Sequence, residues 1–353
     1  MRDRRLPGSC IAMLLSVTGC VGAQGTGSDS SQDDKLDAFR AGGGADAPVD
    51  LCARRGWYGD GECDTFCELP DRDCESTEPG EAGGGTEDTG TDAWQRFAEA
   101  GRHEVRMTEG RYEGRCEVRY ELYAPASERP TVLAVLAHGF RREPAQMAGH
   151  AVQLASWGLT TLVPRLCERS LLGADHTRNG LDVAEVARVV ADEVGATSIV
   201  HVGFSAGGGS ALAACADEPR CVGVLGLDPV GDDRATTFDR PDVARSAIFG
   251  EPQRCNRDND ALGLWRDSLS ARVVRIPGAT HADFESPTAF PLDQFCGEGP
   301  EASSDSIRLL LTAFALYAGG IDPTAEDLWR PGTPAHDALV ERGLVRAIPN
   351  GDR

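Results

Sequence analysis

One serine in this chain lies in a setting that favours nucleophilic chemistry. Ser205 is the central residue of 203–207, which has the sequence Gly-Phe-Ser-Ala-Gly. A β-branched run from Ser198 predicts a buried strand before this pattern, and the small residues 210–216 predict a helix after it. A sharp strand-to-helix turn exposes the serine oxygen, and glycines flank it because side chains would collide there. We therefore predict an exposed nucleophile, with the Ala206 N–H placed to stabilise an oxyanion.

A serine hydroxyl needs a base that takes its proton, and the chain offers seven histidines. His281 follows the last predicted buried strand, 271–276, and comes after Ser205, which is the chain order expected for this kind of turn. His201 falls inside the buried strand, and His176 precedes the serine. We predict that His281 is the base, rather than a structural loop histidine. The other histidines are His103, His138, His150 and His336.

The imidazole in turn needs a carboxylate that accepts its second N–H and stabilises the imidazolium. Asp228 directly follows the predicted strand 221–227. Glu251 follows the next predicted strand, 246–249. On position alone both are candidates, and an ordinary turn or helix-capping role is the simpler alternative for Asp228.

The region from residue 93 onward alternates predicted strands and helices. Most of its strands are apolar without interruption, which is typical of a mostly parallel sheet covered by helices on both faces, an α/β fold. In such sheets, ligand sites form at the carboxyl ends of the strands, where Ser205, Asp228 and His281 fall. The predicted strands are 117–123, 131–137, 159–163, 198–202, 221–227, 246–249 and 271–276, and the predicted helices are 146–157, 180–194, 210–216 and 306–317.

Three short segments resemble the α/β-hydrolase superfamily. They are residues 138–140 (His-Gly-Phe) after an early strand, the turn at 203–207, and His281 after the last strand. The resemblance covers 93–353 and implies the α/β-hydrolase fold with a catalytic serine. It also implies that the Phe140 N–H joins the amide after the serine in an oxyanion hole.

Within the superfamily, the chain is most similar to the branch of chlorophyllases, dienelactone hydrolases and cutinase-like polyester hydrolases. This similarity rests on residues 226–230 (Gly-Leu-Asp-Pro-Val), with looser matches at Asn256 and 279–284. It implies that Asp228, rather than Glu251, is the acid. It further implies a serine carboxylic-ester hydrolase that acts on small-molecule or polymeric esters through an acyl-enzyme, with no metal or organic cofactor.

Two other classes of function remain open from the sequence. A hydrolase scaffold can bind a ligand without catalysis, so the chain could be a surface-binding protein. The same three side chains can also cleave amides, which would make it a peptidase or amidase. Activity on matched ester and amide substrates distinguishes these classes.

The first 92 residues differ in composition from the rest. Residues 1–19 combine a basic start with a short apolar run, which indicates an export signal. Residues 17–20 (Val-Thr-Gly-Cys) resemble the lipobox of bacterial lipoproteins, which implies lipidation of Cys20 and a membrane anchor. A plain secretory signal is the alternative. We then predict a disordered tether, a small cysteine-rich module and an acidic glycine-rich linker, at 20–50, 51–75 and 76–92.

The cysteine-rich module must depend on disulfides, because its four cysteines span too few residues to enclose a core. Its Gly-Asp-Gly-x-Cys-Asp run, from Gly59 to Asp64, resembles small extracellular modules of the Notch-repeat kind, which bind calcium. We favour turn-forming aspartates over calcium ligands here.

Composition restricts the partners and the compartment. A net charge of −21 over 353 residues argues against nucleic acid and anionic membrane surfaces as partners. Twelve cysteines without a Cys-x-x-Cys pair favour disulfides over zinc, and hence an exported protein, either a cell-envelope lipoprotein or secreted. We also expect a monomer. Six of the cysteines lie in the main domain, and we expect the pairs Cys116–Cys167, Cys215–Cys221 and Cys255–Cys296.

Overall fold

The computed structural model describes residues 94–126, 130–168, 175–231, 238, 240–266, 271–289 and 292–348. The predicted export signal, the tether with Cys20, the cysteine-rich module and the linker lie outside the described residues. No helix in the described ranges is both long and apolar enough to cross a membrane.

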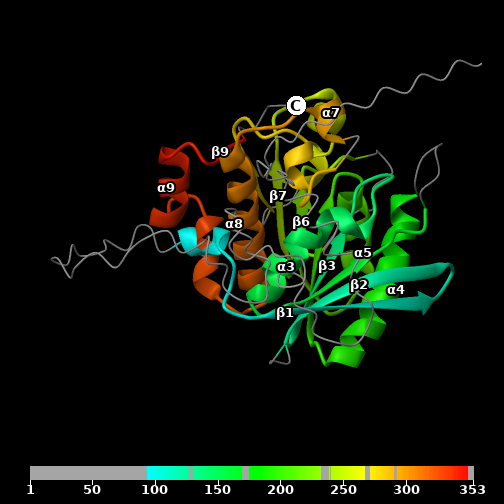
Figure 1. Cartoon of the computed structure of the whole chain (residues 1–353). Coiled ribbons are helices and arrows are strands. Elements are labelled where there is room, and N and C mark those ends of the chain that lie inside the picture. Colours follow the sequence, from blue (N-terminus) through cyan, green and yellow to red (C-terminus); the bar gives the residue numbers. More distant parts are fainter. Residues whose placement is uncertain are drawn as a thin grey trace, which may run out of the picture.

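The described part of the chain is built around a nine-stranded sheet (Figure 1). The strand order is β1-β2-β4-β3-β5-β6-β7-β8-β9. Neighbouring strands from β4 to β8 are parallel, whereas β1–β2, β2–β4 and β8–β9 are antiparallel. The strands are β1 (Val105–Glu113), β2 (Glu117–Pro125), β3 (Val132–Ala137), β4 (Thr160–Pro164), β5 (Ser198–Phe204), β6 (Cys221–Leu227), β7 (Ala244–Phe249), β8 (Ala271–Arg275) and β9 (Arg346–Ala347). The prediction of an α/β fold with a mostly parallel sheet is confirmed.

Helices pack on both faces of this sheet. Figure 1 shows α3 and α8 to one side of the central strands, and α4 and α5 to the other. The α-helices are α3 (Ala148–Ser156), α4 (His176–Val194), α5 (Gly207–Asp217), α6 (Leu262–Arg266), α7 (Leu292–Cys296), α8 (Glu301–Ala318) and α9 (Pro334–Glu341). The 3-10 helices are η2 (Gln95–Ala98), η3 (Pro144–Met147), η4 (Arg254–Asn259), η5 (Ala282–Phe284) and η6 (Pro323–Leu328).

Strand β3 illustrates why both faces must be covered. Every residue of β3 is buried. Because side chains alternate along a strand, Ala134 and Leu136 pack in the same cluster as residues of α3 and α8. Leu133 and Val135 pack on the opposite face, in the cluster that contains residues of α4. A strand that is apolar on both faces must therefore lie at the centre of the sheet, where helices cover both of them.

The structure also contains elements that the sequence did not predict. Strand β1 pairs with β2 along its whole length and forms the edge of the sheet. Its residues are only half-buried or exposed, so its sequence lacks the apolar pattern of a central strand. The short elements α6, α7, α9 and β9 were also missed, since a few residues carry too little periodicity to be recognised.

The six cysteines of this region form the three expected disulfides. The Cα atoms are 6.4 Å apart for Cys116–Cys167, 5.3 Å for Cys215–Cys221 and 5.8 Å for Cys255–Cys296. The last of these joins η4 to α7, two segments that come before and after His281 in the chain. It thereby restricts the loop that carries this histidine.

Candidate active site

Ser205 occupies the turn between β5 and α5. Its φ of +53° lies in the left-handed region, which residues other than glycine seldom adopt. The Ser205 N–H donates to the Leu227 carbonyl at 3.0 Å, and the Ser205 carbonyl accepts from the Gly208 N–H at 2.9 Å. These bonds hold the strained backbone between β6 and the first turn of α5, so the serine has one fixed position.

The two glycines of the pattern are required by close backbone contacts. A Cβ atom on Gly203 would lie 2.1 Å from the Gly207 carbonyl oxygen. A Cβ atom on Gly207 would lie 2.3 Å from the carbonyl oxygen of Ala137, at the end of β3. Either side chain would have to displace the main chain. The glycines therefore allow α5 to start directly against β3 and β5, as expected from the sequence.

His281 lies in the loop after β8, at the N-cap of η5, and contacts both of its expected partners. Its Nε2 lies 2.9 Å from Ser205 Oγ, and its Nδ1 lies 2.6 Å from Asp228 Oδ2. The tautomer with hydrogen on Nδ1 satisfies both contacts, since Nδ1 then donates to the carboxylate and Nε2 accepts from the hydroxyl. The imidazole is almost fully buried and packs against the Phe204 ring, with ring centroids 4.8 Å apart.

Asp228 follows β6 directly, and its side chain is fully buried. Oδ1 accepts from the Gly250 N–H at 3.0 Å. The side-chain amide of Asn256 lies 3.1 Å from Oδ2 and 3.3 Å from Oδ1. Because both oxygens are hydrogen-bonded, the buried carboxylate is held in one orientation toward His281.

Glu251, the alternative acid, lies apart from this arrangement. Its carboxylate accepts from the Gly278 N–H at 3.2 Å and forms an ion pair with Arg346 at 3.2 Å. Its side chain is 39% exposed, whereas that of Asp228 is 0% exposed. The structure thus brings Ser205, His281 and Asp228 together and places Glu251 in a separate ion pair.

Asn256 is the residue of this site that the sequence identified least clearly. It is fully buried in η4, next to the disulfide-bonded Cys255. Besides contacting Asp228, its Nδ2 donates to the Glu251 carbonyl at 2.8 Å. The adjacent Arg257 and Asp258 have φ of 52° and 56°, which turn the chain so that Asn256 points inward. Only a loose local resemblance in the sequence indicated this position.

Replacing Asn256 with alanine should weaken the support of Asp228. We expect kcat/KM for an ester to fall about 10-fold, equivalent to about 1.4 kcal/mol. The free energy of unfolding should fall by about 1–3 kcal/mol, because a buried carboxylate loses a donor. Ester kinetics and urea unfolding measure the two effects. Unchanged kinetics in a destabilised protein would limit Asn256 to a structural role.

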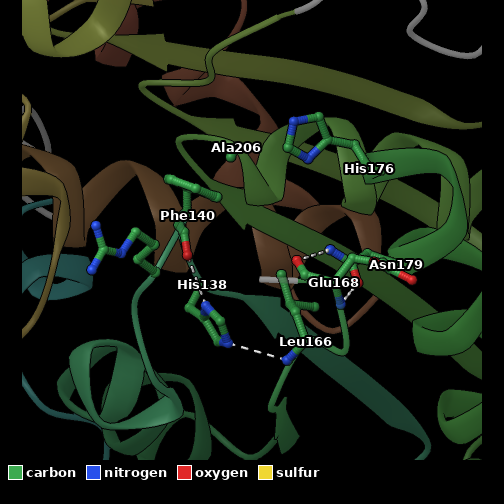
Figure 2. Close-up of a pocket in the computed structure, with 9 residues that line it drawn as sticks. His138, Phe140, Leu166, Glu168, His176, Asn179 and Ala206 are labelled. Carbon is green, nitrogen blue, oxygen red and sulfur yellow. Dashed lines mark hydrogen bonds between the residues drawn. The ribbon is translucent and has the colours of Figure 1, made fainter. Parts of the chain in front are cut away.

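Phe140 and Ala206, the two residues expected to form an oxyanion hole, border one pocket (Figure 2). Phe140 follows β3, and Ala206 immediately follows the serine. In the turns and loops of the described residues, neither the Phe140 nor the Ala206 N–H donates to a backbone carbonyl. Both N–H groups are therefore free of backbone acceptors where these residues border the pocket.

His138 holds the loop that carries Phe140. Its Nε2 accepts from the Leu166 N–H at 3.1 Å, and its Nδ1 lies 2.9 Å from the Gly139 carbonyl. Figure 2 shows the ring between these two backbone segments. Both ring nitrogens of His138 contact backbone groups, so this histidine joins the loops after β3 and β4.

The pocket beside these amides is small and partly polar. Glu168, His176 and Asn179 form the wall opposite Phe140 and Ala206 (Figure 2). The Asn179 side chain is already engaged, because it accepts from the Glu168 N–H at 2.7 Å and donates to its carbonyl at 3.1 Å. The empty space is about 200 Å³ and includes open solvent, so the enclosed part is smaller still. The pocket therefore suits a small chemical group.

The histidines that the sequence argued against do not contact Ser205. His201 lies within β5 and is completely buried, and neither of its ring nitrogens has a hydrogen-bond partner among the described residues. His150 is buried on α3, with Nε2 3.1 Å from the Phe284 carbonyl. His176 is the first residue of α4 and borders the pocket. His281 is the histidine that the structure places on the serine.

Replacing His201 with leucine should reduce the loss of stability at acidic pH. Burial lowers the pKa of His201 to about 3, whereas an unfolded histidine has a pKa near 6.5. Between these values the unfolded chain binds a proton that the folded chain excludes, so the free energy of unfolding decreases as pH falls below about 6.5. At pH 5 this costs about 2 kcal/mol, which the leucine variant avoids.

Urea unfolding of both proteins at pH 7 and pH 5 measures this difference. The wild type should lose about 2 kcal/mol more than His201→Leu between the two pH values. His150 is retained in both proteins, so its own lowered pKa, about 4, cancels in the comparison. Equal losses in the two proteins would contradict the prediction.

One group of metal-type ligands occurs in the described ranges. Cys116, Cys167 and Asp182 lie within metal-binding distance of one another. The two cysteines form a disulfide, however, and both oxygens of Asp182 accept hydrogen bonds from Arg115. The two sulfur atoms are bonded to each other and the Asp182 oxygens to Arg115, so this cluster offers no thiolate to a metal.

Comparison with known proteins adds no further constraint. No protein-family model matches this chain, and no curated protein matches it either. The site is thus defined by its own geometry: three side chains, from the loops after β5, β6 and β8, form one continuous chain of hydrogen bonds. A hydroxyl, an imidazole and a buried carboxylate in this order can activate the hydroxyl as a nucleophile.

Proposed function

We propose that this protein is a serine hydrolase of the α/β-hydrolase superfamily that cleaves carboxylic esters. The observation that carries the proposal is the hydrogen-bond chain from Ser205 through His281 to Asp228, with distances of 2.9 Å and 2.6 Å. The strained φ of Ser205 and the Phe140 and Ala206 amides at the pocket also support this function, because they are what acyl transfer needs.

The reaction follows from the positions of these groups. Ser205 Oγ attacks the ester carbonyl carbon while His281 Nε2 takes its proton, and Asp228 stabilises the imidazolium. The N–H groups of Phe140 and Ala206 bind the oxyanion. His281 then protonates the leaving alcohol, and an acyl-enzyme remains on Ser205. His281 then takes a proton from water, which attacks the acyl carbon, and gives that proton to Ser205 Oγ as the bond between Oγ and the acyl carbon breaks and the acid leaves.

The substrate class is an ester with a small or exposed acyl group. The limited pocket between Phe140 and the wall of Glu168 and Asn179 favours such groups over long enclosed chains. The resemblance to the chlorophyllase and cutinase-like branch favours a lidless enzyme that accepts small-molecule or polymeric esters. Three disulfides favour an exported protein, anchored through a lipidated Cys20 or secreted.

The full chain, produced under oxidising conditions, allows a direct test. We expect turnover of p-nitrophenyl acetate, slower turnover of longer acyl chains, and labelling by a fluorophosphonate at one site per molecule. Faster cleavage of matched anilides than of esters would instead indicate an amidase or peptidase. A folded protein that neither labels nor turns over any ester would contradict catalysis and favour a binding protein on a hydrolase scaffold.

A further inference from the structure

A buried ion pair links two loops of the candidate site. Arg142 lies in the loop after β3, and Glu285 lies in the segment after η5. Arg142 Nε donates to Glu285 Oε1 at 2.6 Å, and Nη2 donates to Oε2 at 2.5 Å. Nη2 also donates to the Ala289 carbonyl at 2.8 Å. The two residues are 9% and 4% exposed, so this two-pronged contact is almost completely shielded from water.

Each partner is close in sequence to a residue of the site. Arg142 follows Phe140 by two residues, and its N–H donates to the Gly139 carbonyl at 3.2 Å. Glu285 follows His281 by four residues, and its N–H donates to the Ala282 carbonyl at 3.2 Å. Both side chains therefore extend from short, hydrogen-bonded turns. A displacement of either turn would be transmitted directly to the amide donor or to the imidazole.

We propose that the Arg142–Glu285 pair is a positioning clamp that holds two loops in a fixed relation: residues 138–142, the oxyanion loop, and residues 281–289, the histidine loop. A single flexible contact would not do this. The paired guanidinium and carboxylate set both a distance and an orientation, since two parallel hydrogen bonds align the planar groups. The effect on catalysis rests on the proposed hydrolase function, whereas the coupling of the two loops does not.

Two backbone hydrogen bonds also hold the histidine loop against its neighbours. The Ser286 N–H donates to the Gln146 carbonyl, and the Gly149 N–H donates to the Ser286 carbonyl, both at 2.8 Å. These bonds attach the histidine loop to η3 and the start of α3. Neither bond involves the oxyanion loop itself. Arg142 supplies the contact between that loop and the histidine loop.

The charges also explain why the partners depend on each other. Burial raises the pKa of Glu285, and the charges of Arg142 and His281 oppose this increase. Without Arg142, the carboxylate would be a buried charge with no guanidinium to balance it. Without Glu285, Arg142 would keep its charge and lose both carboxylate bonds. Removing either partner should therefore release both loops.

The test uses the full oxidised chain with Glu285→Gln, Arg142→Lys and a matched control. Glu218 is also a buried carboxylate, 1% exposed, and it pairs with Arg188 at 3.1 Å and Arg220 at 3.3 Å. It lies at the far end of α5, about 16 Å along the helix from the serine turn. Glu218→Gln should therefore cost stability without affecting the candidate site.

Hydrogen exchange tests the coupling without using activity. In Glu285→Gln, amides in both 138–142 and 281–289 should exchange at least about 10-fold faster than in wild type. Arg142→Lys should show a smaller effect in the same two segments, and it serves as the second variant if the glutamine protein does not fold. In Glu218→Gln neither segment should change. Faster exchange confined to one loop, or absent from both, overturns the clamp.

Kinetics separate positioning from general stability. Glu285→Gln should lower kcat for p-nitrophenyl acetate about 10- to 100-fold and change KM less than about 3-fold, because a displacement of about 1 Å can cost that much. If Glu285→Gln and Glu218→Gln lose the same free energy of unfolding and the same kcat, the positioning role of Glu285 is overturned. If wild type has no activity, the proposed function fails, and hydrogen exchange alone decides whether the clamp exists.

Discussion

Replacing Ser205 with alanine should lower kcat for p-nitrophenyl acetate by at least about 10⁴-fold and abolish fluorophosphonate labelling. The alanine leaves His281 and Asp228 without a nucleophile, so only the binding of the oxyanion and substrate remains. Stability should change by no more than about 1 kcal/mol, because alanine keeps the same strained backbone and only the hydrogen bond between the hydroxyl and His281 is lost. Steady-state kinetics, mass spectrometry of labelled protein and thermal unfolding measure the three effects.

Ser210 is a suitable matched control for this variant. It lies on α5, is fully buried, and its hydroxyl has no hydrogen-bond partner among the described residues. Ser210→Ala should retain labelling and keep kcat within about 2-fold, since no reacting group contacts that hydroxyl. Labelling that persists in Ser205→Ala and disappears in Ser210→Ala would show that the candidate site has been misidentified.

Replacing Asp228 with asparagine should lower kcat about 10⁴-fold with little change in KM. The amide has nearly the same shape as the carboxylate, but its NH₂ group can donate to His281 Nδ1. The imidazole then carries its hydrogen on Nε2, which faces Ser205 Oγ at 2.9 Å, and it can no longer accept the serine proton. The lost negative charge also leaves the imidazolium without a counter-ion. Ester kinetics at several pH values measure the effect.

Glu251→Gln is the comparison that distinguishes the two acids. Glu251 forms a partly exposed ion pair with Arg346, so its neutral variant should keep kcat within about 2-fold. Its stability should change by less than about 1 kcal/mol. A larger loss of kcat in Glu251→Gln than in Asp228→Asn would reverse the assignment of the acid.

The parts of the fold that could be predicted from the sequence are those with continuous apolar patterns. Strands such as 132–137 and 221–227 are buried on both faces, and their composition alone identifies them. Strand β1 is half-buried at the edge of the sheet, where polar residues are tolerated, so its pattern is weak. Its place in the sheet depends on pairing with β2, which composition does not encode.

The candidate site divides in the same way. Gly203 and Gly207 predict the turn from the local sequence. The backbone contacts that exclude side chains there lie within a few residues or on the adjacent strand. The roles of Asn256 and of the Arg142–Glu285 pair have no such local pattern. Arg142 and Glu285 are 143 residues apart in sequence, and only the packing of the β3 and β8 loops brings them together.

The sequence by itself therefore determined the class of sheet and the serine turn, since these depend on local pattern. Chain spacing predicted the three disulfide pairs, which the tertiary structure confirms. Chain order left Asp228 and Glu251 equivalent, and only a family resemblance favoured Asp228; the tertiary structure places Asp228 beside His281 and Glu251 beside Arg346. Both carboxylates follow adjacent parallel strands and are equivalent in chain order, but one is enclosed at 0% exposure beside His281 while the other, at 39%, reaches Arg346. The direction in which each strand-end loop turns is set by long-range contacts, and those contacts exist only in the folded chain.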